Sequence, residues 1–413
     1  MHYNTVLLNT NFFILILVPI VIGILFFTFL TISFFKYEKF NDIKEKRKFL
    51  IFIPARNEAN VIANLIKSIR SCDYPQELLT IYVLANNCND DTAIIAKNNG
   101  ANVFLLNDKA VNNVGMVLNK FFIYIKESYA SFSAFDGYVR LDADNLVHEN
   151  YFIELNKAFL NNKEVIISYR SNQNFDENLV TSFSSVLVSS AMMGFRLFSA
   201  WKINAMITGP GILLSANIIT RLNGWHLTSL SEDTELSAWL LKEKIKSAFC
   251  YDAIFYDEQT PEMRMLFRQR LRWTKGASQV FRKYKLSLIK GMFSREFFSN
   301  FFLFLGIFPI GFLAILATIA FLLHAIIMSL ITMTPGLIYY WIIFTLSFNL
   351  VPGILISSLM FIVERKRLHI KWYKKLLFII CSPISFITYS LADFCRVFIK
   401  ISWKPIPHGK KST

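Results

Sequence analysis

Long apolar runs at both ends of the chain constrain its fold more than any other feature. Residues Phe12 to Phe35 contain no charged side chain, and further apolar stretches run from Phe301 to Met333, from Leu337 to Val363 and from Leu376 to Ile399. A helix of about 20 apolar residues spans the hydrocarbon core of a bilayer. We therefore expect membrane helices at both ends of the chain and a separate domain between them.

The first apolar run is interpreted as an uncleaved anchor rather than a signal peptide. It is too long for a signal peptide, no Lys or Arg precedes it, and no small-x-small cleavage site follows it. We predict an N-terminal transmembrane anchor at 1–36, a domain at 37–291 that ends in an amphipathic interfacial helix, and a membrane region at 292–413 with two or three spans and a basic tail.

The net charge of +15 is concentrated beside the apolar runs. Six basic residues lie between Lys36 and Lys48, and six more lie between Arg365 and Lys375. Basic side chains that flank a span mark its cytoplasmic side and meet anionic membrane lipid there. We therefore predict a multi-pass protein of the bacterial inner (plasma) membrane with residues 37–291 in the cytoplasm. Because the charges do not form one stripe, no nucleic-acid partner is expected.

Two prolines shape the prediction for the C-terminal membrane region. The last apolar stretch contains Pro383, Asp393 and Arg396, and a span there would place the basic tail outside the cell, against the positive-inside rule. We therefore favour a re-entrant or interfacial segment with a break at Pro383, and a span is the alternative. Pro309 is expected to divide the run from Phe301 to Met333 into an interfacial turn and a true span.

The middle of the chain alternates between strand and helix patterns. Apolar strands are predicted at Phe49–Ala55, Leu79–Ala85, Ala101–Leu106 and Tyr138–Leu141, and residues with helical spacing follow the first. This order is typical of an α/β domain with a mostly parallel sheet, in which ligands bind beyond the carboxyl ends of the strands. The serine-rich stretch from Val180 to Trp201 is predicted to be a buried or interfacial helix.

An Asp-x-Asp motif follows the fourth predicted strand. Asp142 and Asp144 stand on alternate residues of an extended chain, so both side chains point to one side. One carboxylate is able to bind a divalent cation while the other holds ribose or a metal-bound water, and Mg²⁺ suits a site that substrate phosphates complete. Two turn residues at a strand end are the structural alternative.

A lone carboxylate and a basic-aromatic cluster follow later in the chain. Asp233 is the candidate base that takes a proton from an acceptor hydroxyl, and the alternative is a helix start with Ser231 as its N-cap. A helix predicted between 266 and 289 carries Gln269 and Arg272 on one face. Arg272 suits a diphosphate, and Trp273 suits stacking on a sugar.

In combination these motifs resemble the membrane-embedded family 2 glycosyltransferases, which include cellulose, hyaluronan and poly-N-acetylglucosamine synthases. The resemblance runs from about Phe49 to Gly276, and it implies a GT-A fold, a nucleoside-diphosphate sugar donor such as a UDP-sugar, Mg²⁺ or Mn²⁺, and inversion at the anomeric carbon. It implies Asp233 as the catalytic residue, Asp144 as the metal ligand, and as substrate-binding residues Pro54, Arg56, Glu58, Asn86, Asp142, Gly209, Gly211, Glu232, Gln269, Arg272 and Trp273.

The chain departs from the family pattern at two positions. Asn86 stands where the family has an acidic residue that recognises the nucleobase, and Val114 stands where the family often has a lysine. Lys109 or Lys120 is a candidate to replace that lysine, and weak donor binding is the alternative.

From these motifs we expect an enzyme that extends a polysaccharide or another glycan acceptor at the membrane. The alternatives are transfer of a single sugar to a lipid phosphate carrier and a non-catalytic subunit that binds sugar nucleotides. The sequence leaves the oligomeric state open.

Overall fold

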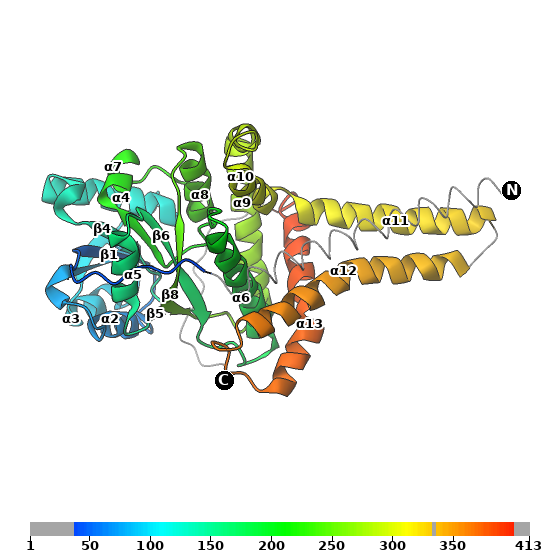
Figure 1. The fold of residues 1–413 in the computed structure, drawn as a ribbon, viewed down its shortest axis with the longest axis horizontal. Helices are drawn as coiled ribbons and strands as arrows, with labels where there is room; N and C mark the ends of the chain where they lie inside the picture. The colour runs from blue at the N-terminus through cyan, green and yellow to red at the C-terminus, as the bar shows by residue number, and fades with distance from the viewer. Residues whose placement is uncertain (1–36, 333–335, 400–413) are drawn as a thin grey trace.

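A single sheet organises the structure, a computed structural model that describes residues 37–332 and 336–399 (Figure 1). The predicted anchor at 1–36 and the basic tail from residue 400 lie outside the described residues. The strands lie in the order β3-β2-β1-β4-β7-β6-β8-β5. Their bounds are β1 Phe49–Ala55, β2 Leu79–Asn86, β3 Asn102–Leu106, β4 Gly137–Arg140, β5 Leu146–Val147, β6 Val165–Asn172, β7 Ile212–Ser215 and β8 Ala248–Asp257.

Most neighbouring strands are parallel, and strand β7 is the important exception. β1 pairs in parallel with β2 and β4, whereas β7 runs antiparallel between β4 and β6, with Ile212 opposite both Arg140 and Ile167. The start of β7 therefore lies at the same edge of the sheet as the ends of β1, β2, β4, β6 and β8. The predicted α/β fold with a mostly parallel sheet is confirmed.

The first four strands fall where the sequence predicts them, but strands β6, β7 and β8 were not predicted. β7 is only four residues long, and it directly follows two glycines that read as a turn. β8 contains Asp252 in an otherwise apolar-aromatic run and shifts register between Ser168 and Tyr169 of β6. Neither strand therefore shows a regular period of two along its sequence.

Helices cover both faces of the sheet because alternate residues of each strand point to opposite sides. Phe49, Ile51 and Ile53 pack in one core cluster, and Leu50 and Phe52 pack in the other. The first cluster takes in residues of α2 (Ile62–Arg70) and α5 (Tyr151–Leu160). The second takes in residues of α4 (Val114–Tyr129), α6 (Leu179–Ala200), α7 (Ala216–Arg221), α8 (Glu232–Lys242) and α9 (Met263–Gly291).

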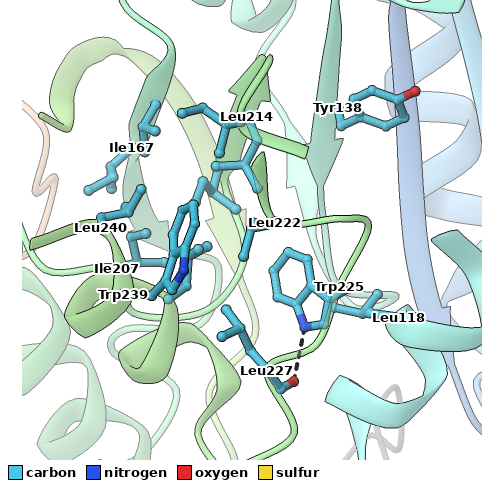
Figure 2. Packing of buried hydrophobic residues seen from close by; sticks show 14 of the residues in the cluster. Leu118, Tyr138, Ile167, Ile207, Leu214, Leu222, Trp225, Leu227, Trp239 and Leu240 are labelled. Carbon is cyan, nitrogen blue, oxygen red and sulfur yellow. Dashed lines mark hydrogen bonds between the residues drawn. The ribbon is translucent and has the colours of Figure 1, made fainter. Parts of the chain in front are cut away.

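Trp225 is central to the second cluster (Figure 2). Its ring stacks on Phe122 with a centroid distance of 6.0 Å, and its Nε1–H donates to the Leu227 carbonyl oxygen at 3.1 Å. The indole is therefore buried with its single polar group satisfied, as a buried tryptophan requires. This packing holds the loop that leads from α7 toward α8.

Two long helices project from the α/β domain (Figure 1). α10 (Phe297–Ile307) and α11 (Ile310–Thr332) are separated at Phe308 and Pro309, so the predicted division is confirmed. α12 (Gly336–Val363) returns alongside α11. Among residues 37–332 and 336–399, three helical stretches are long and apolar enough to cross a membrane by length and composition, namely Leu179–Ala200, Ile310–Ile331 and Trp372–Cys395. Of these, the first is largely buried inside the protein.

Helix α13 (Trp372–Cys395) runs across the base of the α11–α12 pair and packs against α6 and α9 on its other side (Figure 1). The break predicted at Pro383 is wrong, because the helix continues through this residue. Proline lacks the N–H that would bond to the carbonyl of Ile379. The Ser382 hydroxyl donates to that carbonyl instead, at 2.8 Å, so the carbonyl keeps a partner.

A pair of strand leucines tests the contribution of the core. Leu214→Ala on β7, where the side chain is fully buried, is expected to lower the free energy of unfolding by about 2–5 kcal/mol. Leu105→Ala on β3, where the leucine is 63 % exposed, is expected to change it by less than about 0.5 kcal/mol. Chemical denaturation of the purified protein measures both values, and equal losses would contradict the described sheet order.

Candidate active site

Two adjoining cavities lie at the edge of the sheet where strands β1, β2, β4, β6 and β8 end. The first, here called the edge cavity, has a volume of about 180 Å³ and lies directly over these strand ends. The second, here called the helix-lined cavity, has a volume of about 690 Å³ and extends toward α10, α11 and α13. The two cavities share the lining residues Arg140, Asp142, Arg170, Gln269 and Arg272.

The structure gathers nearly all residues that the sequence singled out around these two cavities. The edge cavity is lined by Pro54, Arg56, Glu58, Asn86, Asp142, Asp144, Gln269 and Arg272. The helix-lined cavity is lined by Gly209, Glu232, Asp233 and Trp273, together with the shared residues. The predicted metal ligand and the predicted base therefore belong to adjoining spaces that meet at Asp142. Gly211 alone lines neither cavity.

Arg140 connects the two cavities through a buried ion pair. Its guanidinium lies 2.8 Å from Glu232 and 3.6 Å from Asp142, measured between nitrogen and oxygen atoms. Arg140 and Glu232 are each 5 % exposed. Burial raises the pKa of the Glu232 carboxyl, and the positive charge of Arg140 opposes that rise. Glu232 is thus occupied by an internal partner, and it orients Arg140 beside the Asp-x-Asp motif.

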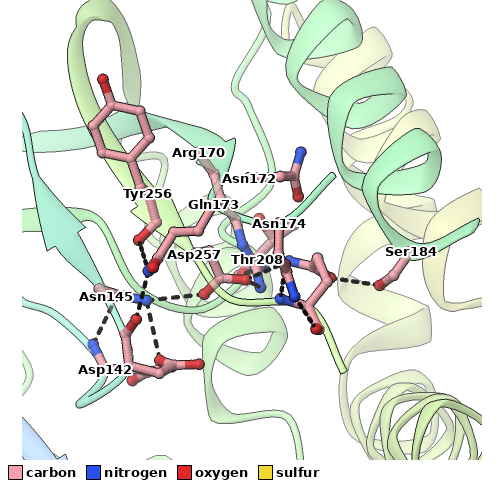
Figure 3. Close-up of polar contacts among 12 residues, drawn as sticks. Asp142, Asn145, Arg170, Asn172, Gln173, Asn174, Ser184, Thr208, Tyr256 and Asp257 are labelled. Carbon is pink, nitrogen blue, oxygen red and sulfur yellow. Dashed lines mark hydrogen bonds and ion pairs between the residues drawn. The ribbon is translucent and has the colours of Figure 1, made fainter. Parts of the chain in front are cut away.

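A second network supports the loop that carries Asp142 and Asp144 (Figure 3). The Asn145 side chain accepts from the Asp142 backbone N–H at 2.9 Å and donates to Asp144 at 3.2 Å and to Asp257 at 2.9 Å. Asp257 also pairs with Arg170 at 2.5 Å. The loop after β4 is therefore tied to β6 and β8, and the Asp144 carboxylate is held by Asn145.

The Asp-x-Asp carboxylates suit a divalent cation that a substrate completes. The Asp142 side chain is 38 % exposed, and both carboxylates face the edge cavity. Within residues 37–332 and 336–399, no group of three His, Cys, Asp or Glu side chains is arranged to hold a metal ion by itself. A hard cation such as Mg²⁺ takes few protein ligands and keeps places for phosphate oxygens and water. The residues present fit such a site.

Asp233 lies in the first turn of α8, at the wall of the helix-lined cavity. Its Oδ1 accepts from the Thr234 backbone N–H at 2.7 Å. The N-cap is Ser231, as predicted, but the predicted capping bond is absent: the Ser231 hydroxyl donates to the Trp273 carbonyl at 3.4 Å. The reason is the close approach of α9, where a Cβ on Gly276 would lie 2.1 Å from the Ser231 Oγ.

Helix α9 presents different residues to the cavities and to α13. Gln269, Arg272 and Trp273 line the cavities. Arg270 is fully buried and donates to the Ser385 carbonyl at 2.6 Å and to the Thr388 hydroxyl, both on α13. Burial lowers the pKa of Arg270 to about 10, which leaves the side chain charged at neutral pH. No role was predicted for Arg270, although it lies inside the Gln-x-x-Arg-Trp motif.

The two departures from the family pattern both fall on the edge cavity. Asn86 is 4 % exposed and accepts from the Asn87 side chain at 2.9 Å, and Val114 lies nearby at the start of α4. The side chains of Lys109 and Lys120 are exposed and line neither cavity, so neither takes the place of the missing lysine. The cationic side chains that do line the edge cavity are arginines, namely Arg56, Arg140, Arg170 and Arg272.

Three residues of the site were missed at the sequence level: Arg140, Arg170 and Asp257. Arg140 carries a detectable signal, because a charged residue inside the buried run Val139-Arg140-Leu141 requires a buried partner. Arg170 and Asp257 carry no such signal. Arg170 lies two residues before the end of β6 and Asp257 ends β8, and the sequence pattern revealed neither strand.

Comparisons with known proteins agree with this architecture. The model of the glycosyl transferase family group 2 matches residues 139–361, more than half of the chain. The probable glycosyltransferase YdaM of Bacillus subtilis (strain 168) is 27 % identical over 293 residues, which cover 68 % of each chain. A mannosyltransferase from Pyrobaculum calidifontis, solved with GDP-Man and Mn²⁺, superposes with a TM-score of 0.53 at 11 % identity and covers 91 % of this chain and 94 % of its own. That likeness is one of fold.

Gly209 and Gly211 both have positive φ angles, of 102° and 75°, but their surroundings differ. A Cβ on Gly211 would lie 2.1 Å from the buried Phe255 ring, whereas a Cβ on Gly209 would meet only Asp233 Oδ2 at 3.9 Å. Gly211→Ala is therefore expected to lose about 1–3 kcal/mol more unfolding free energy than Gly209→Ala. Denaturation of both variants measures the difference in unfolding free energy. Equal losses would show that contact with the Phe255 ring is not what requires glycine at position 211.

Proposed function

The chain belongs to the glycosyl transferase family group 2, and on that premise we propose that it transfers a sugar with inversion from a nucleoside-diphosphate sugar to an acceptor hydroxyl at a membrane surface. The meeting of the two cavities at Asp142 carries this proposal. The diphosphate donor would occupy one cavity and the acceptor the other, and the two would meet where the cavities join. The GT-A-like fold and the family's glycosyltransferase activity are the established part.

The donor is proposed to occupy the edge cavity. Arg272 lies where a guanidinium is able to bind a diphosphate through two hydrogen bonds. Asp144 would hold Mg²⁺ or Mn²⁺, which when bound offsets the charge of the diphosphate. The Pyrobaculum mannosyltransferase was solved with GDP-Man and Mn²⁺, which supports a metal-dependent nucleotide-sugar donor here. Asn86 would face the nucleobase, and we expect a uridine nucleotide.

Asp233 is proposed as the base for the acceptor. Its carboxylate takes the proton of the acceptor hydroxyl while that oxygen bonds to the anomeric carbon and the bond from this carbon to the diphosphate breaks. The diphosphate leaves with the bonding electrons and remains beside Arg272. One carboxylate suffices, since inversion needs no covalent sugar–enzyme intermediate. Trp273 lines the same space and would stack on the acceptor sugar.

The placement in the membrane is proposed from α11, α12 and α13. The first two project together from the α/β domain, and the basic segment Arg365–Lys375 leads into α13 at the domain side of this pair (Figure 1). The α/β domain would then lie in the cytoplasm. α13, which runs across the base of the pair, would lie at the interface rather than span. The predicted position of the basic tail falls outside the described residues.

A growing glycan is the proposed acceptor, and a lipid phosphate carrier is the second candidate. The non-catalytic subunit has less support, because Asp142, Asp144 and Asp233 all face the cavities where the chemistry would need them.

Replacing the proposed base tests the reaction. Asp233→Asn keeps the size of the side chain but cannot accept a proton, so turnover should fall by about 10²–10⁴-fold while donor binding persists. Asp73→Asn, an exposed aspartate remote from both cavities, is the matched control and should retain full turnover. Nucleotide release and calorimetric donor binding are measured together. Loss of donor binding in parallel with turnover would assign Asp233 a purely structural role.

Removing the metal tests the donor site. EDTA and Asp144→Ala should each abolish both transfer and metal-dependent donor binding, because the diphosphate charge is then not offset. Added Mn²⁺ should restore the EDTA-treated native protein and leave the variant inactive. A panel of nucleotide sugars identifies the donor in the same assay. Full activity of the native protein in EDTA would disprove the metal site.

A further inference from the structure

We propose that the helix-lined cavity binds the apolar chain of a lipid acceptor, and that the group which reacts is a hydroxyl at the polar end of that lipid. This inference rests on the proposed sugar transfer with Asp233 as the base, and it names a lipid hydroxyl as the acceptor in place of the growing glycan proposed above. The cavity volume of about 690 Å³ falls in the range of about 300–1,000 Å³ that is typical of sites for small molecules.

The two ends of the cavity differ in chemistry. At the end next to the edge cavity, the helix-lined cavity has charged walls. They are formed by Asp233, Glu232, Arg140, Arg170 and Arg272. Toward α10 and α11 its walls are mostly apolar, with Leu187 and Val188 on α6, Leu305 and Ile307 on α10, and Phe386 on α13. The Asp393–Arg396 ion pair at the end of α13 is the charged feature of this part of the wall. A ligand that matches both ends has one polar group and one apolar chain.

The apolar end of the cavity adjoins the surface that the proposed topology gives to lipid. Gly306 and Ile310 line the cavity and are exposed, and Ile310 is 47 % exposed. They begin the segment that continues into the apolar helix α11, whose most apolar 18-residue stretch has no residue buried inside the protein. A lipid chain would therefore pass from the bilayer into the cavity without crossing water, which favours burial of its apolar surface.

The described helices do not favour a channel for a hydrated glycan instead. Within Ile310–Thr332 and Gly336–Val363 there is no Asp, Glu, Lys or Arg. Membrane pathways for polar solutes are lined by polar or charged groups that replace the water shell. The wall formed by α10 and α11 supplies Leu305, Ile307, Phe308 and Ile310 instead.

The charges around the cavity favour a hydroxyl over a phosphate as the reacting group. Arg396 lines the cavity, but it pairs with Asp393 at 3.0 Å and donates to the Thr274 carbonyl. Arg140 is likewise held by Glu232 at 2.8 Å. Arg170, which also lines the cavity, pairs with Asp257 at 2.5 Å, and Arg272 is the side chain proposed to bind the donor diphosphate. A lipid phosphate would therefore meet arginines that are paired or are assigned to the donor, and it would lie against the carboxylates of Glu232 and Asp233. A neutral hydroxyl avoids that repulsion, and the proposed base Asp233 is able to take its proton.

A matched pair of glycine variants isolates the cavity. Gly306→Leu places a side chain in the cavity, where a Cβ would find its nearest atom, Met206 Sδ, at 3.4 Å. Gly194→Leu makes the same change in a helix at a position with no atom within 4 Å of the new Cβ and outside the cavities. Both variants replace a helical glycine by leucine, and only Gly306 lines the cavity, so loss of ligand binding in Gly306→Leu alone reports on the cavity.

The full-length protein in lipid nanodiscs is first photolabelled with dodecyl glucoside that carries a diazirine on its alkyl chain. Labelling is expected on peptides from α6, α10 and α13, and it should fall about tenfold in Gly306→Leu but not in Gly194→Leu. Labelling that is absent from these helices, or equal in the two variants, would overturn the proposal whatever sugar the acceptor carries.

Transfer is then measured with methyl, octyl and dodecyl glucoside, diacylglycerol and undecaprenyl phosphate. We expect KM to fall by about tenfold or more from the methyl to the dodecyl compound, and Gly306→Leu to remove most of that gain. Chain-length-independent KM, or use of the polyprenyl phosphate alone, would overturn the lipid-hydroxyl inference while leaving sugar transfer intact. If nucleotide release is the same with and without any added acceptor, the proposed sugar transfer itself is wrong.

Discussion

The buried ion pair between Arg140 and Glu232 is the contact on which the geometry of the site depends. Each partner is adjacent in sequence to a motif: Arg140 precedes Asp142 by two residues, and Glu232 directly precedes Asp233. Their nitrogen and oxygen atoms lie 2.8 Å apart, and each residue is 5 % exposed. Removal of either partner would leave a buried unpaired charge and lower the free energy of unfolding by about 3–5 kcal/mol. The pair thus fixes the carboxylates proposed for donor and acceptor relative to each other.

A second buried charge joins the site to helix α13. Arg270 lies beside Gln269 and two residues before Arg272, yet it points away from the cavities and binds Ser385 and Thr388 on α13. Ser385 in turn donates to the Phe183 carbonyl on α6 at 2.5 Å. α9 is therefore held between the α/β domain and α13, and its cavity-facing side chains cannot move independently of α13.

How far the sequence predicts this structure depends on the range of the interaction. Asp142, Asp144 and Asn86 could be placed together because the carboxyl ends of parallel strands share one edge of a sheet. Arg170 and Asp257 could not, because β6 and β8 join the first four strands only through the antiparallel β7, whose position no local pattern reveals. The break expected at Pro383 failed for a different, local reason: the hydroxyl of the adjacent Ser382 satisfies the carbonyl that the proline leaves free.

The continuity of α13 has a consequence for how the site would meet the membrane. A helix broken at Pro383 would give two short segments able to tilt separately, whereas one helix of 24 residues moves as a unit. Its Ser385 and Thr388 bind α9, while Phe386 and Tyr389 line the helix-lined cavity. A displacement of α13 by an acceptor between it and α11 would therefore reach Arg270 directly, and through α9 it would reach the side chains proposed to bind the diphosphate and the sugar.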